Sequence, residues 1–280
     1  MFAPTQIASS LFALGTVCSW GVSDFIGGYT ARRFEPFLLA GLGHLAGTIY
    51  VATLAIASHQ PAPALSHLAW ASAGGACGGL ALGLFYRALS GNMGLAAPVS
   101  AVLSAAIPGV FAILTRGVPA PITIGGFALA LLGIWLISRP EGGARPEGLG
   151  LALIAGIGFA LFYIFMDRAG SGAAFWLATA SRGMAFVATA IIIVAGRKFS
   201  PTYPAGFGLG ILAGCVDVTG TVLFIRAAQT GRLDTAVILS SLYPMITVLL
   251  ARIILKEHFT RWKAVGVIAA LAAVPMITAG

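Results

Sequence analysis

The chain has very few charged residues. Only 9% of its 280 residues are Asp, Glu, Lys or Arg, against about 25% in soluble globular proteins. A soluble domain of this length covers its surface with charged and polar side chains, which are almost never fully buried. The composition therefore excludes an ordinary soluble protein and directs attention to the positions of the few charges.

Cysteine and histidine are also scarce, and neither follows a metal-ligand spacing. The three cysteines fall inside apolar runs, where we expect them to pack as small apolar residues rather than form disulfides. No HExxH, CxxC or Walker-type pattern is present. The sequence therefore predicts no catalytic residues, no metal and no cofactor, and no ATP-binding domain of its own. The three cysteines are Cys18, Cys77 and Cys215, and the four histidines are His44, His59, His67 and His258.

Long apolar runs fill most of the chain. Hydrophobic residues make up 59% of it, and the mean hydropathy is +0.97. Because a spanning helix needs about 20 apolar residues, the runs predict an all-α polytopic membrane protein of ten transmembrane helices. The polar breaks between them are too short to hold a soluble domain. The expected helices are 6–27, 34–57, 67–88, 93–115, 120–138, 147–166, 173–195, 205–228, 233–254 and 262–279.

Basic residues concentrate at one side of the expected membrane. Eleven lie in or near odd-numbered connections and four in or near even-numbered ones, while the sixteenth, Arg182, lies within a span. Since Lys and Arg favour the cytoplasmic side, we expect a multi-pass protein of a bacterial inner membrane with both termini outside. The net charge of +8 then reflects contact with the lipid bilayer rather than with nucleic acid. The four basic residues in or near even-numbered connections are Arg116, Arg168, Arg226 and Arg232.

Two short motifs recur in the same order in the two halves. Leu84–Ala88 (LFYRA) resembles Leu223–Ala227 (LFIRA), and Ser104–Pro108 resembles Ser240–Pro244, at offsets of 139 and 136 residues. This predicts a duplication into residues 1–143 and 144–280. Each copy would hold five helices, so the second copy would enter the membrane inverted. Inverted repeats are typical of secondary transporters, which bind substrate near the midplane between the repeats.

The chain resembles the EamA-type transporters of the drug/metabolite transporter superfamily along nearly its whole length. The resemblance rests on Ser19-Trp20-Gly21, the two repeated motifs, and Leu255–Thr260 followed by Gly266. Two departures are visible: Lys256 stands where the family has a glycine before Glu257, and the first repeat has no glutamate in Gly117–Ala120. The resemblance is greatest to exporters of amino acids, including aromatic ones, that also pass cationic drugs. It implies ten helices with both termini on one side of the membrane. We expect the two inverted repeats to form a central cavity between them.

Three ionisable residues lie deep in expected spans. Asp217 lies about 18 Å and Arg182 about 14 Å along their helices, which run antiparallel, so the two can meet at one depth. They form either a structural ion pair or a site in which Arg182 binds a carboxylate and Asp217 an ammonium. His44 is either a packed neutral imidazole or a proton relay. Intramembrane ionisable residues are candidate functional residues by default.

Aromatic residues complete the candidate binding site. Trp20 precedes Asp24 by one helical turn, so the two share a face of the first helix. Asp24 lies toward the end of that helix, where we expect solvation near the interface, although a substrate-facing position with Trp20 stays open. Tyr86, Tyr163 and Tyr243 lie on three further helices. An aromatic wall would hold organic cations and aromatic side chains.

Prolines mark expected kinks. Pro98 and Pro108 fall in the fourth expected helix, Pro244 in the ninth and Pro275 in the tenth. Because proline lacks a backbone N–H and clashes with the preceding turn, it bends or breaks a helix. We expect Pro98, Pro108 and Pro244 to act as hinges or to shape the cavity.

The function that these patterns favour is export of small zwitterionic or cationic metabolites by alternating access, by a protein that acts as a monomer. A carrier of sugar nucleotides or phosphate with the same fold is an alternative, but such cargo calls for several cavity cations. An intramembrane enzyme and a channel are the alternatives from other classes. Neither a catalytic cluster nor a filter-like repeat is present to support them.

Overall fold

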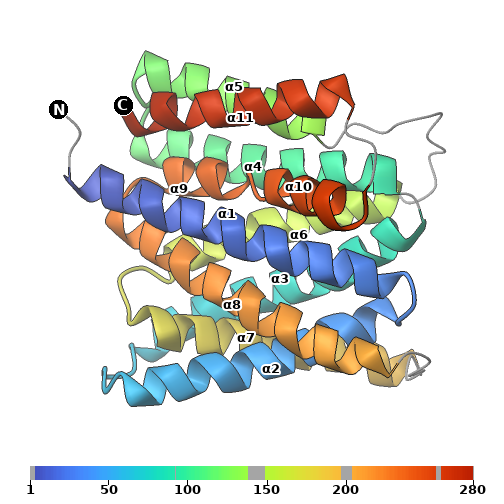
Figure 1. Ribbon diagram of the computed structural model, residues 1–280. Helices are drawn as coiled ribbons and strands as arrows, with labels where there is room; N and C mark the ends of the chain where they lie inside the picture. Colours follow the sequence, from blue (N-terminus) through green and yellow to red (C-terminus); the bar gives the residue numbers. More distant parts are fainter. Residues whose placement is uncertain (1–3, 92, 138–148, 197–203, 257–259, 280) are drawn as a thin grey trace.

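The computed structural model describes residues 4–91, 93–137, 149–196, 204–256 and 260–279. Within these ranges all regular structure is helical (Figure 1). The boundary expected at residues 143 and 144 lies outside the described residues. The helices are α1 (Pro4–Ala31), α2 (Pro36–Ala57), α3 (Leu65–Gly91), α4 (Met93–Arg116), α5 (Pro121–Ile137), α6 (Leu149–Arg168), α7 (Ala174–Ala195), α8 (Ala205–Thr230), α9 (Leu233–Ser240), α10 (Pro244–Ile254) and α11 (Arg261–Ala279).

The helices confirm a polytopic membrane protein. Among the described residues, eight helical stretches are long and apolar enough to cross a bilayer. Two further apolar stretches, Ser100–Arg116 and Pro121–Ile137, are shorter than 18 residues and coincide with the fourth and fifth expected spans. The count of ten membrane crossings therefore stays a prediction, with eight supported by length and hydropathy.

The ninth expected span is divided. It forms two helices, because α9 ends at Ser240 and α10 begins at Pro244. Proline at the first position of α10 has no N–H to donate into the preceding turn, which ends α9. In contrast, α4 passes through Pro108 and α11 through Pro275 without a break. Pro98 also lies within α4, and its side chain is outside the described part.

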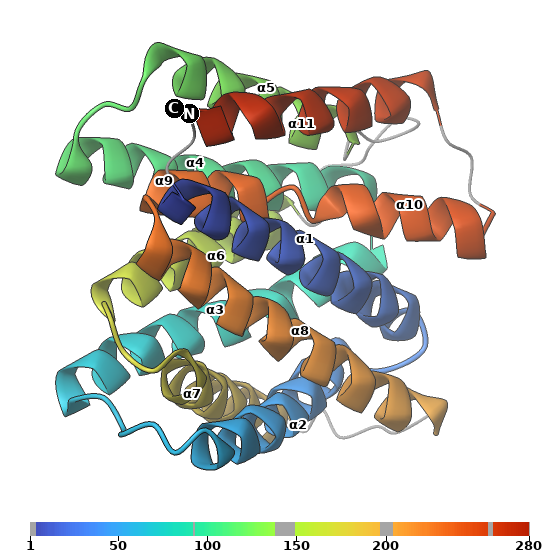
Figure 2. The same cartoon turned by 60° about the vertical axis from the view of Figure 1, so that its left-hand side comes forward.

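The helices pack in long pairs. The most extensive contacts join α1 to α8, α5 to α11, α3 to both α6 and α7, and α2 to α7, as the views in Figures 1 and 2 show. Glycines make the tightest approaches: a Cβ on Gly214 would overlap the backbone of Gly43, and one on Gly75 would overlap the carbonyl of Ser181. Small residues allow helices in a membrane to approach this closely. These contacts bring α7 and α8 against the first half of the chain.

Polar contacts connect the helix ends at the face that holds both termini (Figure 1). Arg116 at the end of α4 forms an ion pair with Asp167 near the end of α6. Arg232 before α9 pairs with Asp234 at 2.7 Å and donates to the Gly117 carbonyl at 2.8 Å. The hydrogen bond to Asp234 raises the pKa of Arg232 above its ordinary value, so its guanidinium stays charged. This face is therefore held together by charge as well as by packing.

Candidate functional site

A small cavity lies where six helices and the α9–α10 break meet. Its volume is about 60 Å³, room for a few water molecules. Gly75, Gly78 and Gly79 of α3 form a smooth wall on one side of it. Six of the eight residues predicted to bind substrate line this cavity. They are Trp20, Asp24, Tyr163, Arg182, Asp217 and Tyr243.

Arg182 of α7 is the centre of a buried polar network. Its Nη1 lies 2.7 Å from Oδ2 of Asp217 on α8, and its Nη2 donates to the hydroxyl of Thr221, one turn further along α8. The two ionisable groups therefore meet, as their expected depths in the membrane predict. A buried guanidinium needs a counter-ion and hydrogen-bond acceptors because its desolvation cost is large. Its Nε is buried and has no partner in the described structure.

His44 of α2 joins the same network. Arg182 Nη1 lies 3.5 Å from His44 Nδ1, so a neutral imidazole accepts from the guanidinium. The His44 side chain is buried, and its Nε2 has no partner within the described residues. A protonated imidazole here would face the guanidinium of Arg182. The contact thus fits the packed neutral interpretation, and the proton-relay role stays a prediction.

A second, smaller hollow adjoins the main cavity. Its volume is about 10 Å³, and its lining includes Ser23, His44, Tyr86 and Asp217. Asp217 and Leu82 line both spaces. The two predicted residues that do not line the main cavity therefore lie next to it. All eight predicted side chains are gathered within one region.

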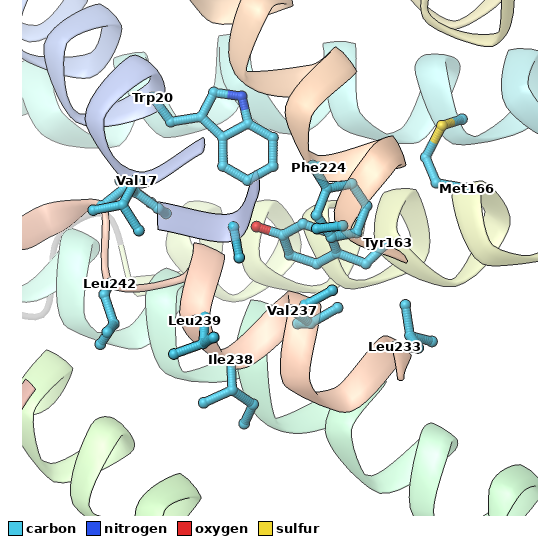
Figure 3. Packing of buried hydrophobic residues seen from close by; sticks show 14 of the residues in the cluster. Val17, Trp20, Tyr163, Met166, Phe224, Leu233, Val237, Ile238, Leu239 and Leu242 are labelled. Atoms are coloured by element: carbon cyan, nitrogen blue, oxygen red, sulfur yellow. The ribbon is translucent and has the colours of Figure 1, made fainter. Parts of the chain in front are cut away.

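Aromatic rings form another part of the cavity wall. The Trp20 ring lies 5.9 Å from that of Tyr163 and 6.3 Å from that of Tyr243, and it also contacts Phe162 and Phe224. Figure 3 shows Trp20, Tyr163 and Phe224 side by side. The indole N–H of Trp20 donates to the Asp217 carbonyl at 3.1 Å, which fixes the ring between α1 and α8. Edge and tilted ring contacts of this kind are favourable.

Asp24 lies in the cavity and not, as expected, at the membrane interface. The reason is that α1 continues to Ala31, one turn beyond the expected end at residue 27, so Asp24 lies deeper. Within the described part of the chain its carboxylate has no hydrogen bond and no ion pair. The cavity is therefore lined by two carboxylates, Asp24 and Asp217, and one cation, Arg182.

Sequence reasoning missed several residues of the site. Thr221 could have been found, because it follows Asp217 by one helical turn and so shares its face. Phe162 and Phe224 carry no such signal, since an apolar helix shows no preference for one face. Ser104 and Ser181 line the cavity as well and resemble many other small polar residues in the chain. Pro108 and Pro244 are buried and do not line it.

Three comparisons place the chain among known proteins. Residues 146–279, most of the second half, match the model of the EamA-like transporter family. The match supports the resemblance to the drug/metabolite transporter superfamily. One solved crystal structure has a TM-score of 0.74 and 16% sequence identity, covering 96% of this chain and 95% of that chain; at this identity it shows the fold alone. No curated protein matches the sequence.

Proposed function

We propose that this protein is a membrane transporter that exports small zwitterionic or cationic molecules through its central cavity by alternating access. The observation that carries the proposal is the cavity itself. It combines ionisable groups at membrane depth with an aromatic wall, where several helices meet. Residues of this kind inside spans mark substrate paths in membrane proteins. The EamA-like match of the second half supports transport as the class of activity.

The pairing of helices supports two inverted repeats. If α1 to α5 correspond to α6, α7, α8, α9 with α10, and α11, then exchanging the halves turns the α1–α8 pair into the α6–α3 pair, and both are extensive. The α2–α7 and α5–α11 pairs exchange onto themselves. The cavity lies between the halves, where such transporters bind substrate. In this proposal each half rocks against the other around the cavity.

The size of the cavity supports a resting, contracted arrangement. Ligand pockets usually measure about 300–1,000 Å³, whereas this cavity measures about 60 Å³. An amino acid would enter only after helices part on one face of the membrane. The smooth glycine contacts of α3 with α7 allow sliding of this kind.

A carrier of phosphate or sugar nucleotides is less well supported. Dianionic cargo calls for several cations, and Arg182 is the single cation that lines the cavity in the described part of the chain. That guanidinium is already paired with Asp217. An intramembrane metalloenzyme has no support either, because the described residues hold no group of side chains suited to a metal.

Transport by purified protein in liposomes tests the proposal. Liposomes loaded with one unlabelled compound are placed in a trace of the same compound carrying a radiolabel, and counterflow is followed. The panel covers amino acids from glycine to tryptophan and permanently charged organic cations, with and without a pH gradient. We expect accumulation above protein-free liposomes for part of the panel. If no compound exceeds that background, the transporter assignment is wrong.

A further inference from the structure

The ionisable groups of the cavity are not all paired. Arg182 is neutralised by Asp217 at 2.7 Å, while Asp24 lines the same cavity without a hydrogen bond or an ion pair among the described residues. An ionisable group at membrane depth usually has a partner or faces a water-filled space. Asp24 therefore has no partner among the described residues, and the positive charge of a cargo molecule would pair with it.

The cavity offers no equivalent open position for a negative charge. Both terminal nitrogens of Arg182 are occupied, one by Asp217 and one by Thr221. The remaining nitrogen, Nε, is buried away from the cavity surface. A carboxylate on the cargo would have to displace Asp217 and leave a second acid uncompensated. Like charges brought together in this way oppose binding.

The walls next to Asp24 suit the body of an organic cation. Trp20 precedes Asp24 by one turn of α1, and both face the cavity. Tyr163 and Tyr243 lie with their rings 5.9 and 6.3 Å from that of Trp20. Aromatic faces attract quaternary and primary ammonium groups and also stack on aromatic rings. The Asp24 side chain would bind the positive charge, and the aromatic wall would bind the body of the same organic cation.

We propose that the cavity selects organic monocations over zwitterionic amino acids, with Asp24 as the residue that binds the positive charge. This inference rests on the proposed transport function and narrows its substrate class. The cargo is an ammonium compound with an aromatic or apolar body and no carboxylate. Arg182 and Asp217 hold the helices at the cavity and neutralise each other, rather than binding the two ends of a zwitterion.

A matched pair of probes tests the selectivity. Phenethyltrimethylammonium and N,N,N-trimethylphenylalanine carry the same permanent positive charge and the same ring, and they differ only by a carboxylate. Neither depends on protonation of its nitrogen, so passive leak of a free base is avoided. Binding to the purified protein is measured by calorimetry, and transport by counterflow in liposomes. We expect the wild type to bind the cation at least about tenfold more tightly than the zwitterion, because the carboxylate of the zwitterion would lie close to the acidic side chains of the cavity.

Two variants assign the selectivity to a residue. Asp24→Asn keeps the shape of the side chain and removes its charge, so we expect it to lose at least about tenfold in affinity for the cation and little for the zwitterion. Glu35→Gln is the control: it removes a carboxylate at the N-terminus of α2, outside the cavity, where an amide oxygen still accepts from the Leu38 N–H. This control should keep the wild-type ratio of the two affinities.

Each remaining outcome has a distinct meaning. Equal binding of the two probes by the wild type, or preference for the zwitterion, overturns the proposal even if Asp24→Asn does not fold. Equal losses for both probes in a folded Asp24→Asn protein would show that Asp24 does not bind the ammonium. If transport of other cargo continues in either case, the transporter function stands. If the wild type moves no compound of any kind, the proposed function itself fails.

Discussion

At the scale of single residues, Arg182 determines how the centre of the molecule tolerates charge. Its guanidinium contacts Asp217, Thr221 and His44, side chains of α8 and α2. A buried ion pair is costly to form, but removing one partner is costlier still because the other charge is left unpaired. The ion pair joins α7 to α8, and His44 adds α2 to the same network. The effect of removing the pair therefore depends on whether one partner or both are replaced.

The first prediction compares a single with a double substitution at this pair. Arg182→Ala leaves Asp217 uncompensated, and we expect a loss of about 3–5 kcal/mol in stability. Replacing Arg182 with Met and Asp217 with Leu removes both charges, and stability should return toward that of the wild type. Thermal unfolding of the purified proteins in detergent measures both effects. A double variant as unstable as Arg182→Ala would contradict the ion-pair account.

The second prediction concerns Trp20, which serves both the core and the cavity wall. Its side chain is only 8% exposed, so Trp20→Ala would leave a void costing about 3–5 kcal/mol. Trp20→Phe keeps an aromatic face and loses the hydrogen bond to the Asp217 carbonyl. If Trp20 holds cargo by its ring, the Ala variant should lose about 0.5–2 kcal/mol in binding of aromatic cations, while the Phe variant loses less.

Comparison with small cargo separates binding from packing. Glycine-sized substrates touch little of an aromatic wall, so their transport by a folded Trp20→Ala protein should change less than that of aromatic ones. An equal loss for both would mean that Trp20 only supports packing. Counterflow in liposomes with matched amounts of folded protein gives the comparison.

Most of the site residues were predictable because depth in a membrane follows from position in a helix. The rise of about 1.5 Å per residue placed Arg182 and Asp217 at one level before their contact was known. For Asp24 the sequence left an interfacial and a cavity-facing position open, because hydropathy locates helix ends only to within a turn, and α1 runs to Ala31. Phe162 and Phe224 could not be predicted, since which face of an apolar helix points inward depends on its neighbours.

At the scale of helices, glycines determine how closely the elements approach. Gly214 of α8 lies against Gly43 of α2, and a Cβ at Gly214 would overlap the Gly43 backbone. Gly79 of α3 lies against Ala185 of α7, where an added Cβ would come within 2.6 Å of the Ala185 Cβ. Glycines four residues apart, Gly75 and Gly79 of α3 and Gly210 and Gly214 of α8, are a sequence pattern that predicts packing faces. The partner of each face became known only from the structure.

The third prediction uses two glycines of the same helix. Gly214→Ala should force α2 and α8 apart and cost about 1–3 kcal/mol, as overpacking does. Gly208 of α8 has no atom within 4 Å of its added Cβ, so Gly208→Ala should be neutral or should stabilise the helix by about 0.5–1 kcal/mol. Thermal unfolding in detergent compares them. Equal stability of the two variants would show that the close approach is not required.

The break between α9 and α10 could not be predicted from the repeated motif. Pro108 and Pro244 occupy corresponding positions of the repeated motif, so the sequence predicts equal bends. Only Pro244 ends a helix, and Tyr243 beside it lines the cavity. Both prolines lack the same N–H, so the difference arises from the packing around them. A proline predicts a weakness in a helix, and neighbouring helices decide whether it becomes a break.

At the scale of the whole molecule, polar contacts as well as packing hold the face that carries both termini. Arg116 at the end of α4 pairs with Asp167 near the end of α6, and Arg232, which pairs locally with Asp234, donates to the Gly117 carbonyl. The sequence predicted the sides of the loops from their basic residues, and the placement of the termini outside stays a prediction. It did not predict which helices lie side by side, because hydropathy carries no information on neighbours in the membrane.

The last prediction follows from alternating access, in which cargo leaves only if the helices at this face separate. The ion pair of Arg116 with Asp167 joins α4 of the first half to α6 of the second, so these ends should part during the cycle. Replacing both residues with cysteine, in a protein whose Cys18, Cys77 and Cys215 are changed to alanine, allows a short thiol cross-linker to hold them together. We expect cross-linking to stop counterflow while leaving cargo binding to protein in detergent measurable. A linker cleavable by reductant should restore transport when cut, and each single-cysteine variant should be unaffected by the reagent. If transport continues at full rate with the cross-link nearly complete, the ends of α4 and α6 move as one body, and the path for cargo must open elsewhere on this face.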